Sequence, residues 1–153
     1  MTSVRIQKAA SSELETLMNW RMEVLHEVFS IPADADTSAL EDANRRYYGS
    51  ALVDGSHIAC FAFLDNEIVG CGGVCLQREM PSPDNPNGLC GYLMNIYVRP
   101  AYRQIGIGEE IVKWLVCQAR ERLVTKIYLE ASDSGQSLYQ NLGFKRMENY
   151  MKL

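Results

Sequence analysis

The feature that most constrains the fold is a junction at which an apolar strand runs through a glycine-bearing loop into an amphipathic helix. The strand Tyr92–Val98 stops before Pro100, and Gly106 and Gly108 precede a segment with apolar residues at helical spacing. A second apolar segment, Lys126–Ala131, follows that helix. This order of strand, helix and strand predicts a right-handed crossover between two parallel strands.

The loop at this junction has the features of a phosphate-binding site. Free backbone N–H groups and the positive end of a helix dipole meet where the helix begins. Gly106 and Gly108 let the backbone approach an anion closely, and Arg103 adds a planar charged donor. The loop lacks the Lys-Ser or Lys-Thr of a Walker A loop, and Ile111 stands where the dinucleotide-binding pattern has its third glycine. We predict an anion site, and the alternative is a plain strand-to-helix turn.

The remaining segments predict a mixed sheet with helices. The expected strands are Val4–Lys8, His57–Leu64, Ile68–Cys75, Gly91–Val98, Lys126–Ala131 and Phe144–Leu153. The expected helices are one carrying Leu14, Leu17, Leu25 and Val28, then about Thr37–Tyr48, one carrying Ile111, Leu115 and Ala119, and about Asp133–Asn141. Three of the five prolines lie between Pro81 and Gly88, which we expect to be a loop. No repeat or linker is evident, so we expect one domain over residues 1–153.

The composition argues against several classes of protein. A formal net charge of -4 disfavours broad binding to nucleic acid or to anionic membranes. Neither a long apolar run nor a signal-peptide pattern is seen in the sequence. The five cysteines lie in apolar segments, which favours small core residues, and Cys71 and Cys75, four apart with no histidine nearby, make a poor zinc site. We therefore expect a cytoplasmic protein with no metal and no nucleic-acid or membrane partner.

Two motifs at the right spacing resemble the GNAT superfamily of N-acetyltransferases. Residues 103–108, Arg-Gln-Ile-Gly-Ile-Gly, are similar to its Arg/Gln-x-x-Gly-x-Gly/Ala signature, and the strand Tyr92–Val98 precedes them at the expected place. Leu138–Phe144 is similar to its Leu-Tyr-x-x-x-Gly-Phe motif. The resemblance implies an α/β (α+β) fold. Its mixed, mostly antiparallel sheet would have about six to seven strands, with a splayed central pair, flanked by about four helices.

The resemblance also implies acetyl-CoA as the co-substrate, lying between the strands Tyr92–Val98 and Lys126–Ala131. Ser132 stands where many members of the family have an asparagine, and it is a candidate partner of the pantetheine arm. The implied binding residues are Ile96, Tyr97 and Val98 in the strand, Arg103, Gln104, Ile105, Gly106, Ile107 and Gly108 in the loop, and Ser132.

The implied reaction is direct attack of a primary amine on the thioester in a ternary complex. An alkylamine with a pKa near ~10.4 must first lose a proton. Tyr139 matches the tyrosine that protonates the leaving thiolate in this family, and the alternative role is a core aromatic. Because no carboxylate lies within Tyr92–Val98, the base is not identified, and Asn95 is a candidate for a water relay.

Arg21 and Tyr92 are the candidate acceptor-binding residues. Arg21 lies on the apolar face of the first helix, so it either forms a structural ion pair or reaches a cleft and binds an acceptor's carboxylate. We expect the acceptor to be a primary amine of a small molecule. The alternatives are a protein N-terminus or lysine as acceptor, and a non-catalytic acyl-CoA-binding or interaction module. The resemblance also makes a homodimer plausible.

Overall fold

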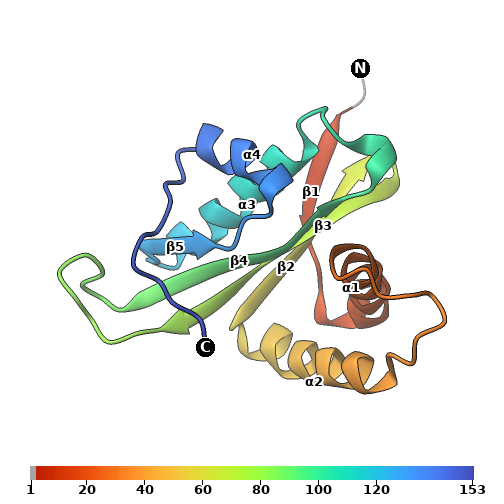
Figure 1. The fold of residues 1–153 in the computed structure, drawn as a ribbon, viewed down its shortest axis with the longest axis horizontal. Helices are drawn as coiled ribbons and strands as arrows, with labels where there is room; N and C mark the ends of the chain where they lie inside the picture. The colour runs from red at the N-terminus through yellow and green to blue at the C-terminus, as the bar shows by residue number, and fades with distance from the viewer. Residues whose placement is uncertain (1–2) are drawn as a thin grey trace.

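The computed structural model describes residues 3–153, which form a sheet with helices on both faces (Figure 1). In this range the sheet has five strands in the order β1-β2-β3-β4-β5. Its neighbours are antiparallel except for the parallel pair β4 and β5. The strands are β1 (Val4–Lys8), β2 (His57–Leu64), β3 (Glu67–Arg78), β4 (Leu89–Val98) and β5 (Lys126–Leu129), and the helices are α1 (Leu14–Val28), α2 (Ser38–Asp54), α3 (Ile107–Glu121) and α4 (Gln136–Asn141).

Each face of the sheet has its own apolar core. The helices α1 and α2 lie on one face, while α3 and α4 lie on the other (Figure 1). The first core joins Leu17 and Trp20 of α1 to Phe61 and Tyr97 of the sheet. The second core includes the α3 residues Ile107, Ile111, Val112 and Leu115, all 0–1% exposed. The apolar spacing that predicted α3 therefore marks the residues that the helix buries.

The pairing of β4 with β3 has one irregularity, and it changes which side chains of β4 face each core. Cys71 pairs with Tyr97 and Gly73 pairs with Met94, so Asn95 and Ile96 together lie opposite Gly72 alone. This is a β-bulge, which turns two successive side chains toward the same face. Met94 and Asn95 face the α1 side, whereas Ile96 packs into the α3 core.

The prediction of a final strand over Phe144–Leu153 is wrong. The segment has no strand ladder, and the sheet has five strands within residues 3–153 rather than the expected six to seven. The strand expected to reach Ala131 ends at Leu129, and the C-terminal segment passes β5 with the Tyr150 ring 5.9 Å from Lys126 Nζ. A strand needs the backbone groups of a neighbouring strand, and this segment pairs with none of the five.

The second helix is longer than expected, and it ends at Asp54 instead of Tyr48. Gly55 follows it in the left-handed conformation at φ 81°, and its N–H bonds to the Ala51 carbonyl. A left-handed glycine at this position is a common helix stop.

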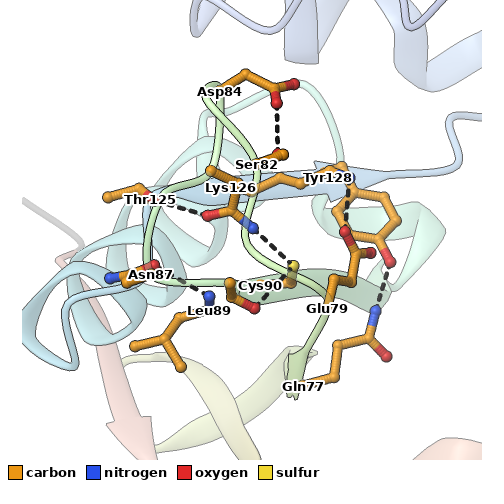
Figure 2. A network of polar contacts seen from close by, with 12 residues as sticks. Gln77, Glu79, Ser82, Asp84, Asn87, Leu89, Cys90, Thr125, Lys126 and Tyr128 are labelled. Carbon is orange, nitrogen blue, oxygen red and sulfur yellow. Dashed lines mark hydrogen bonds and ion pairs between the residues drawn. The ribbon is translucent and has the colours of Figure 1, made fainter.

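The proline-rich connection between β3 and β4 is a loop, as predicted, and polar contacts attach it to β5 (Figure 2). Asn85 is 2% exposed, accepts a hydrogen bond from Thr125 Oγ1 at 2.9 Å and donates to Cys90 Sγ at 3.3 Å. Lys126 and Glu79 form an ion pair at 2.9 Å. The loop therefore positions the start of β5 beside β4. No helix in the described range is long and apolar enough to cross a membrane.

We expect Gly72→Ala to destabilise the fold. A Cβ at this position would lie 2.5 Å from Ile111 Cγ2, so α3 would have to move away from the sheet. The expected loss is about 1–3 kcal/mol in the free energy of unfolding, measured by denaturant titration. The control is Gly49→Ala on the exposed surface of α2, where no atom lies within 4 Å. It should stabilise the protein by about 0.5–1 kcal/mol. Equal effects of the two variants would contradict this account.

Candidate active site

The strands β4 and β5 separate before β4 reaches the loop that leads to α3. They pair only from Cys90 and Lys126 to Leu93 and Leu129. The rest of β4, from Met94 to Val98, extends beyond the last pair. Because the Arg99 N–H bonds to Val69 in β3, strand alternation directs the Val98 N–H to the opposite, unpaired side. This edge can therefore pair with an extended amide-containing ligand.

The loop after β4 brings several backbone N–H groups to the start of α3. Gln104 and Gly106 adopt positive φ angles of 65° and 92°. The Glu110 N–H bonds to the Gly106 carbonyl at 3.2 Å, so the preceding first-turn N–H groups, those of residues 107–109, have no acceptor one helical turn before them. Glu109 is paired with Lys113 at 2.7 Å along the helix surface. Geometry and helix dipole together suit a phosphate here.

Arg103 is held against α1 and not at the start of α3. Its Nε donates to the Val98 carbonyl at 2.7 Å, and its Nη2 donates to both carboxylate oxygens of Glu27 at 3.1 Å. Hydrogen bonds from Tyr97 and Arg103 lower the pKa of Glu27. Tyr97 itself is buried, with its ring 6.2 Å from that of Trp20. Its side chain therefore belongs to the α1 core, which leaves only its backbone for a ligand.

Tyr139 lies on α4 beside a cavity of about 1390 Å³. The cavity is bordered by α3, β5, α4 and the C-terminal segment. The Tyr139 ring makes an edge contact with Phe144 at 5.8 Å, and burial raises its pKa, so the phenol keeps its proton at neutral pH. Tyr92 lines the same cavity, 5.0 Å from Tyr128, while Ser132 is exposed next to Ser134.

A second, smaller cavity of about 200 Å³ lies on the α1 face of the sheet. It brings together Arg21 and Asn95, two candidates that are far apart in the sequence. Arg21 Nη1 donates to Asn95 Oδ1 at 3.0 Å, and Arg21 Nε donates to Asn44 Oδ1 at 2.9 Å. Tyr92 is not part of this cavity. The lining residues are Arg21, Asn44, Tyr47, Tyr48, His57, Cys75, Met94 and Asn95.

Sequence reasoning did not place Asn44, His57, Cys75 or Met94 at a site. Asn44 lies one helical turn before Tyr47 and Tyr48. A polar residue on this inner face of α2 could have indicated a cavity there. Nothing in the apolar strand sequence distinguished His57 or Cys75. Cys117, expected in the core, is exposed.

His57 and Tyr47 form a polar pair on the wall of the smaller cavity. The Tyr47 hydroxyl is 2.8 Å from His57 Nδ1 and 2.9 Å from Cys75 Sγ. His57 Nε2 is buried with no hydrogen-bond partner among the described residues, and it faces Gly73, where a Cβ would lie 2.5 Å away. Burial, with a smaller effect of Arg21, lowers the pKa of His57 to about 4. The ring is therefore neutral at pH 7.

The described part of the chain contains no cluster of three or more His, Cys, Asp or Glu side chains able to hold a metal ion. The polar side chains of the two cavities carry amides, hydroxyls, thiols, carboxylates, guanidinium and ammonium groups and the His57 imidazole.

Comparison with known proteins gives the family. The profile of the acetyltransferase (GNAT) family matches residues 14–144, and the chain belongs to this family. A glucosamine 6-phosphate N-acetyltransferase of Trypanosoma brucei brucei is 28% identical over 86 residues, which are 56% of each chain. The chain spans about half the length of the curated relatives it matches.

Solved structures share the fold over almost the whole chain. A predicted acetyltransferase of Clostridium acetobutylicum, crystallised with acetyl-CoA, is 26% identical with a TM-score of 0.87, covering 99% of this chain and 96% of that one. An aminoglycoside N-acetyltransferase in complex with CoA is 16% identical with a TM-score of 0.77, covering 100% and 95% of the two chains. At 16% identity, the similarity to the aminoglycoside N-acetyltransferase shows only a shared fold.

We expect the stability of the protein to depend on pH through His57. The folded ring has a pKa of about 4 and the unfolded ring one of 6.5, so the unfolded state binds more protons between these values. The free energy of unfolding should therefore fall as the pH drops from 6.5 to 4, by at most on the order of 3 kcal/mol. His57→Gln should remove this part of the slope in urea titrations at several pH values. His26→Gln, at the other histidine, should retain it, and equal slopes in both variants would refute the assignment.

Proposed function

We propose that this protein is an N-acetyltransferase that moves an acetyl group from acetyl-CoA to a primary amine of a small molecule. The amine attacks directly in a ternary complex. One observation carries the proposal. The end of β4 extends past β5 with the edge on that side unpaired, and it leads into a loop whose free N–H groups lie at the start of α3. Membership of the GNAT family supports the same interpretation.

The residues present fit coenzyme A. The unpaired edge of β4 around Ile96 and Val98 suits the amides of the pantetheine arm. The N–H groups from Gln104 to Gly108 suit the pyrophosphate. Acetyl-CoA, when bound, supplies the acetyl group as a reactive thioester. Ser132 is exposed and stays a candidate hydrogen-bonding partner of the pantetheine arm.

Tyr139 is the acid in this proposal. Its raised pKa keeps the proton on the phenol, so the hydroxyl can donate it to a leaving thiolate. Because no carboxylate of the described chain lines the smaller cavity, the amine would lose its proton to solvent or through a polar side chain there. Asn95 is the candidate that holds a relaying water.

The size of the smaller cavity favours a small acceptor over a protein substrate. A volume of about 200 Å³ corresponds to roughly seven water molecules. The curated relatives named as glucosamine 6-phosphate N-acetyltransferases support a small amine acceptor, and that compound is the first one to test. A cytoplasmic location, a single domain and a homodimer stay predictions.

Calorimetric titration with acetyl-CoA is the direct test. We expect micromolar affinity with one site per chain, followed by thiol release when small primary amines are added. Absence of binding up to millimolar ligand would refute the proposal. Binding without transfer to any amine would favour the non-catalytic acyl-CoA-binding module.

We expect Gly106→Ala to weaken coenzyme A binding by about tenfold, because the left-handed conformation costs a residue with a Cβ about 1–2 kcal/mol. No atom lies within 4 Å of the added Cβ, so the effect is one of backbone conformation. Pantetheine, which has no pyrophosphate, should bind both proteins equally in calorimetry. An equal loss for pantetheine would show that the loop does not hold the phosphates.

We expect Tyr139→Phe to lower kcat by about 100-fold or more with little change in the Kd of acetyl-CoA, because it removes the acid and keeps the ring. The assay is steady-state thiol release, with Kd from calorimetry. Tyr128→Phe is the matched control, since Tyr128 lines the same cavity on β5. An unchanged kcat for Tyr139→Phe would remove this residue from the mechanism.

A further inference from the structure

Arg21 differs from the neighbouring arginines of this protein in having no carboxylate partner. Arg99 is paired with Glu23 and Arg103 with Glu27, so these two glutamates of α1 hold cations that follow β4. Arg21 lies on the same helix, and within residues 3–153 it makes no ion pair. A partly buried guanidinium without a counter-charge is unusual in a protein.

The guanidinium is nevertheless held in a defined orientation. Asn44 of α2 accepts from Nε, and Asn95 at the bulge of β4 accepts from Nη1. A guanidinium has five N–H groups, and these two bonds use two of them. The three others have no hydrogen-bond partner in the described chain and remain for a ligand. A planar fork with fixed orientation is suited to a carboxylate or a phosphate.

Among residues 3–153, Arg21 is also the only charged side chain that lines the smaller cavity. The other lining groups are amides, phenols, a thiol, a thioether and the neutral His57 ring. The cavity therefore has one positive charge and no negative one. It favours an anionic ligand and disfavours a polycationic amine.

We propose that Arg21, oriented by Asn44 and Asn95, binds the oxyanion of a compact acceptor that carries both a primary amine and a carboxylate or phosphate. This inference rests on the proposed acetyltransferase function, which it deepens by naming the class of acceptor. Asn44 and Asn95 are positioning residues in it. The cavity volume of about 200 Å³ limits the part of the acceptor that lies inside.

The test compares pairs of amines in which one member carries an anionic group and the other lacks it. The pairs are β-alanine with β-alanine amide, ethanolamine phosphate with ethanolamine, and glucosamine 6-phosphate with glucosamine. The wild-type protein should prefer the anionic member by about 10- to 100-fold in kcat/KM. The pair with the largest ratio distinguishes a carboxylate from a phosphate. A preference for the neutral members, or for none, would overturn the inference.

Two variants and one control assign the preference to Arg21. Arg21→Gln should abolish it, and Arg21→Lys should restore only part of it because a lysine has no fork. Arg45→Gln is the control, since Arg45 lies on the neighbouring helix α2, pairs with Glu15 and does not line the cavity. Retention of the full preference in Arg21→Gln would refute the role of this residue.

A measurement without turnover separates this inference from the proposed function. In ¹⁵N NMR, the Arg21 Nε signal, assigned by its loss in Arg21→Gln, should shift on titration with β-alanine or ethanolamine phosphate and not with ethanolamine. A shift without acetylation of any amine would refute the enzyme and support the anion site. Acetylation without any shift would support the enzyme and overturn the anion site.

Discussion

The bulge in β4 is the constraint on which both candidate sites depend. Asn95 takes a φ of 60°, a conformation that asparagine tolerates better than most residues. The extra residue sends Met94 and Asn95 to the α1 side, while Ile96 returns to the α3 side. The hydrogen bond from Arg21 to Asn95 lies at this point and helps to offset the cost of the strained backbone. One irregular residue thus shapes the small cavity and directs the end of β4.

The same strand serves as the common wall of the two halves of the proposed ternary complex. Toward α3, the unpaired edge and the N–H groups of the loop suit a long phosphorylated ligand. Toward α1 and α2, the smaller cavity has room for a compact amine beside Arg21 and Asn95. Because the two ligands would approach from opposite faces of the sheet, neither has to leave before the other enters. Direct attack in a ternary complex requires both ligands to be bound at the same time, and this arrangement allows it.

The elements that local patterns determine were predictable, and those that depend on distant partners were not. The spacing of Ile111, Leu115 and Ala119 predicted α3 because a helix buries one face whatever its neighbour is. The strand expected over Phe144–Leu153 is wrong because β5 is short and makes no ladder with that segment. Arg21 and Asn95 were each singled out, but the sequence separation of 74 residues hid their contact. His57 lies in a continuous apolar run that gave no indication of its cavity.

The position of Arg103 shows how the α1 face and the anion loop are coupled. The sequence suggested that this residue binds phosphate, yet Glu27 and the Val98 carbonyl hold it. Both charged side chains are about two-fifths exposed, and such a pair contributes only about 0–1 kcal/mol. Because this ion pair contributes so little, a phosphate at the loop can compete with Glu27 for Arg103. In the proposed phosphate site the backbone N–H groups would form the fixed part, and Arg103 would join them only on leaving Glu27.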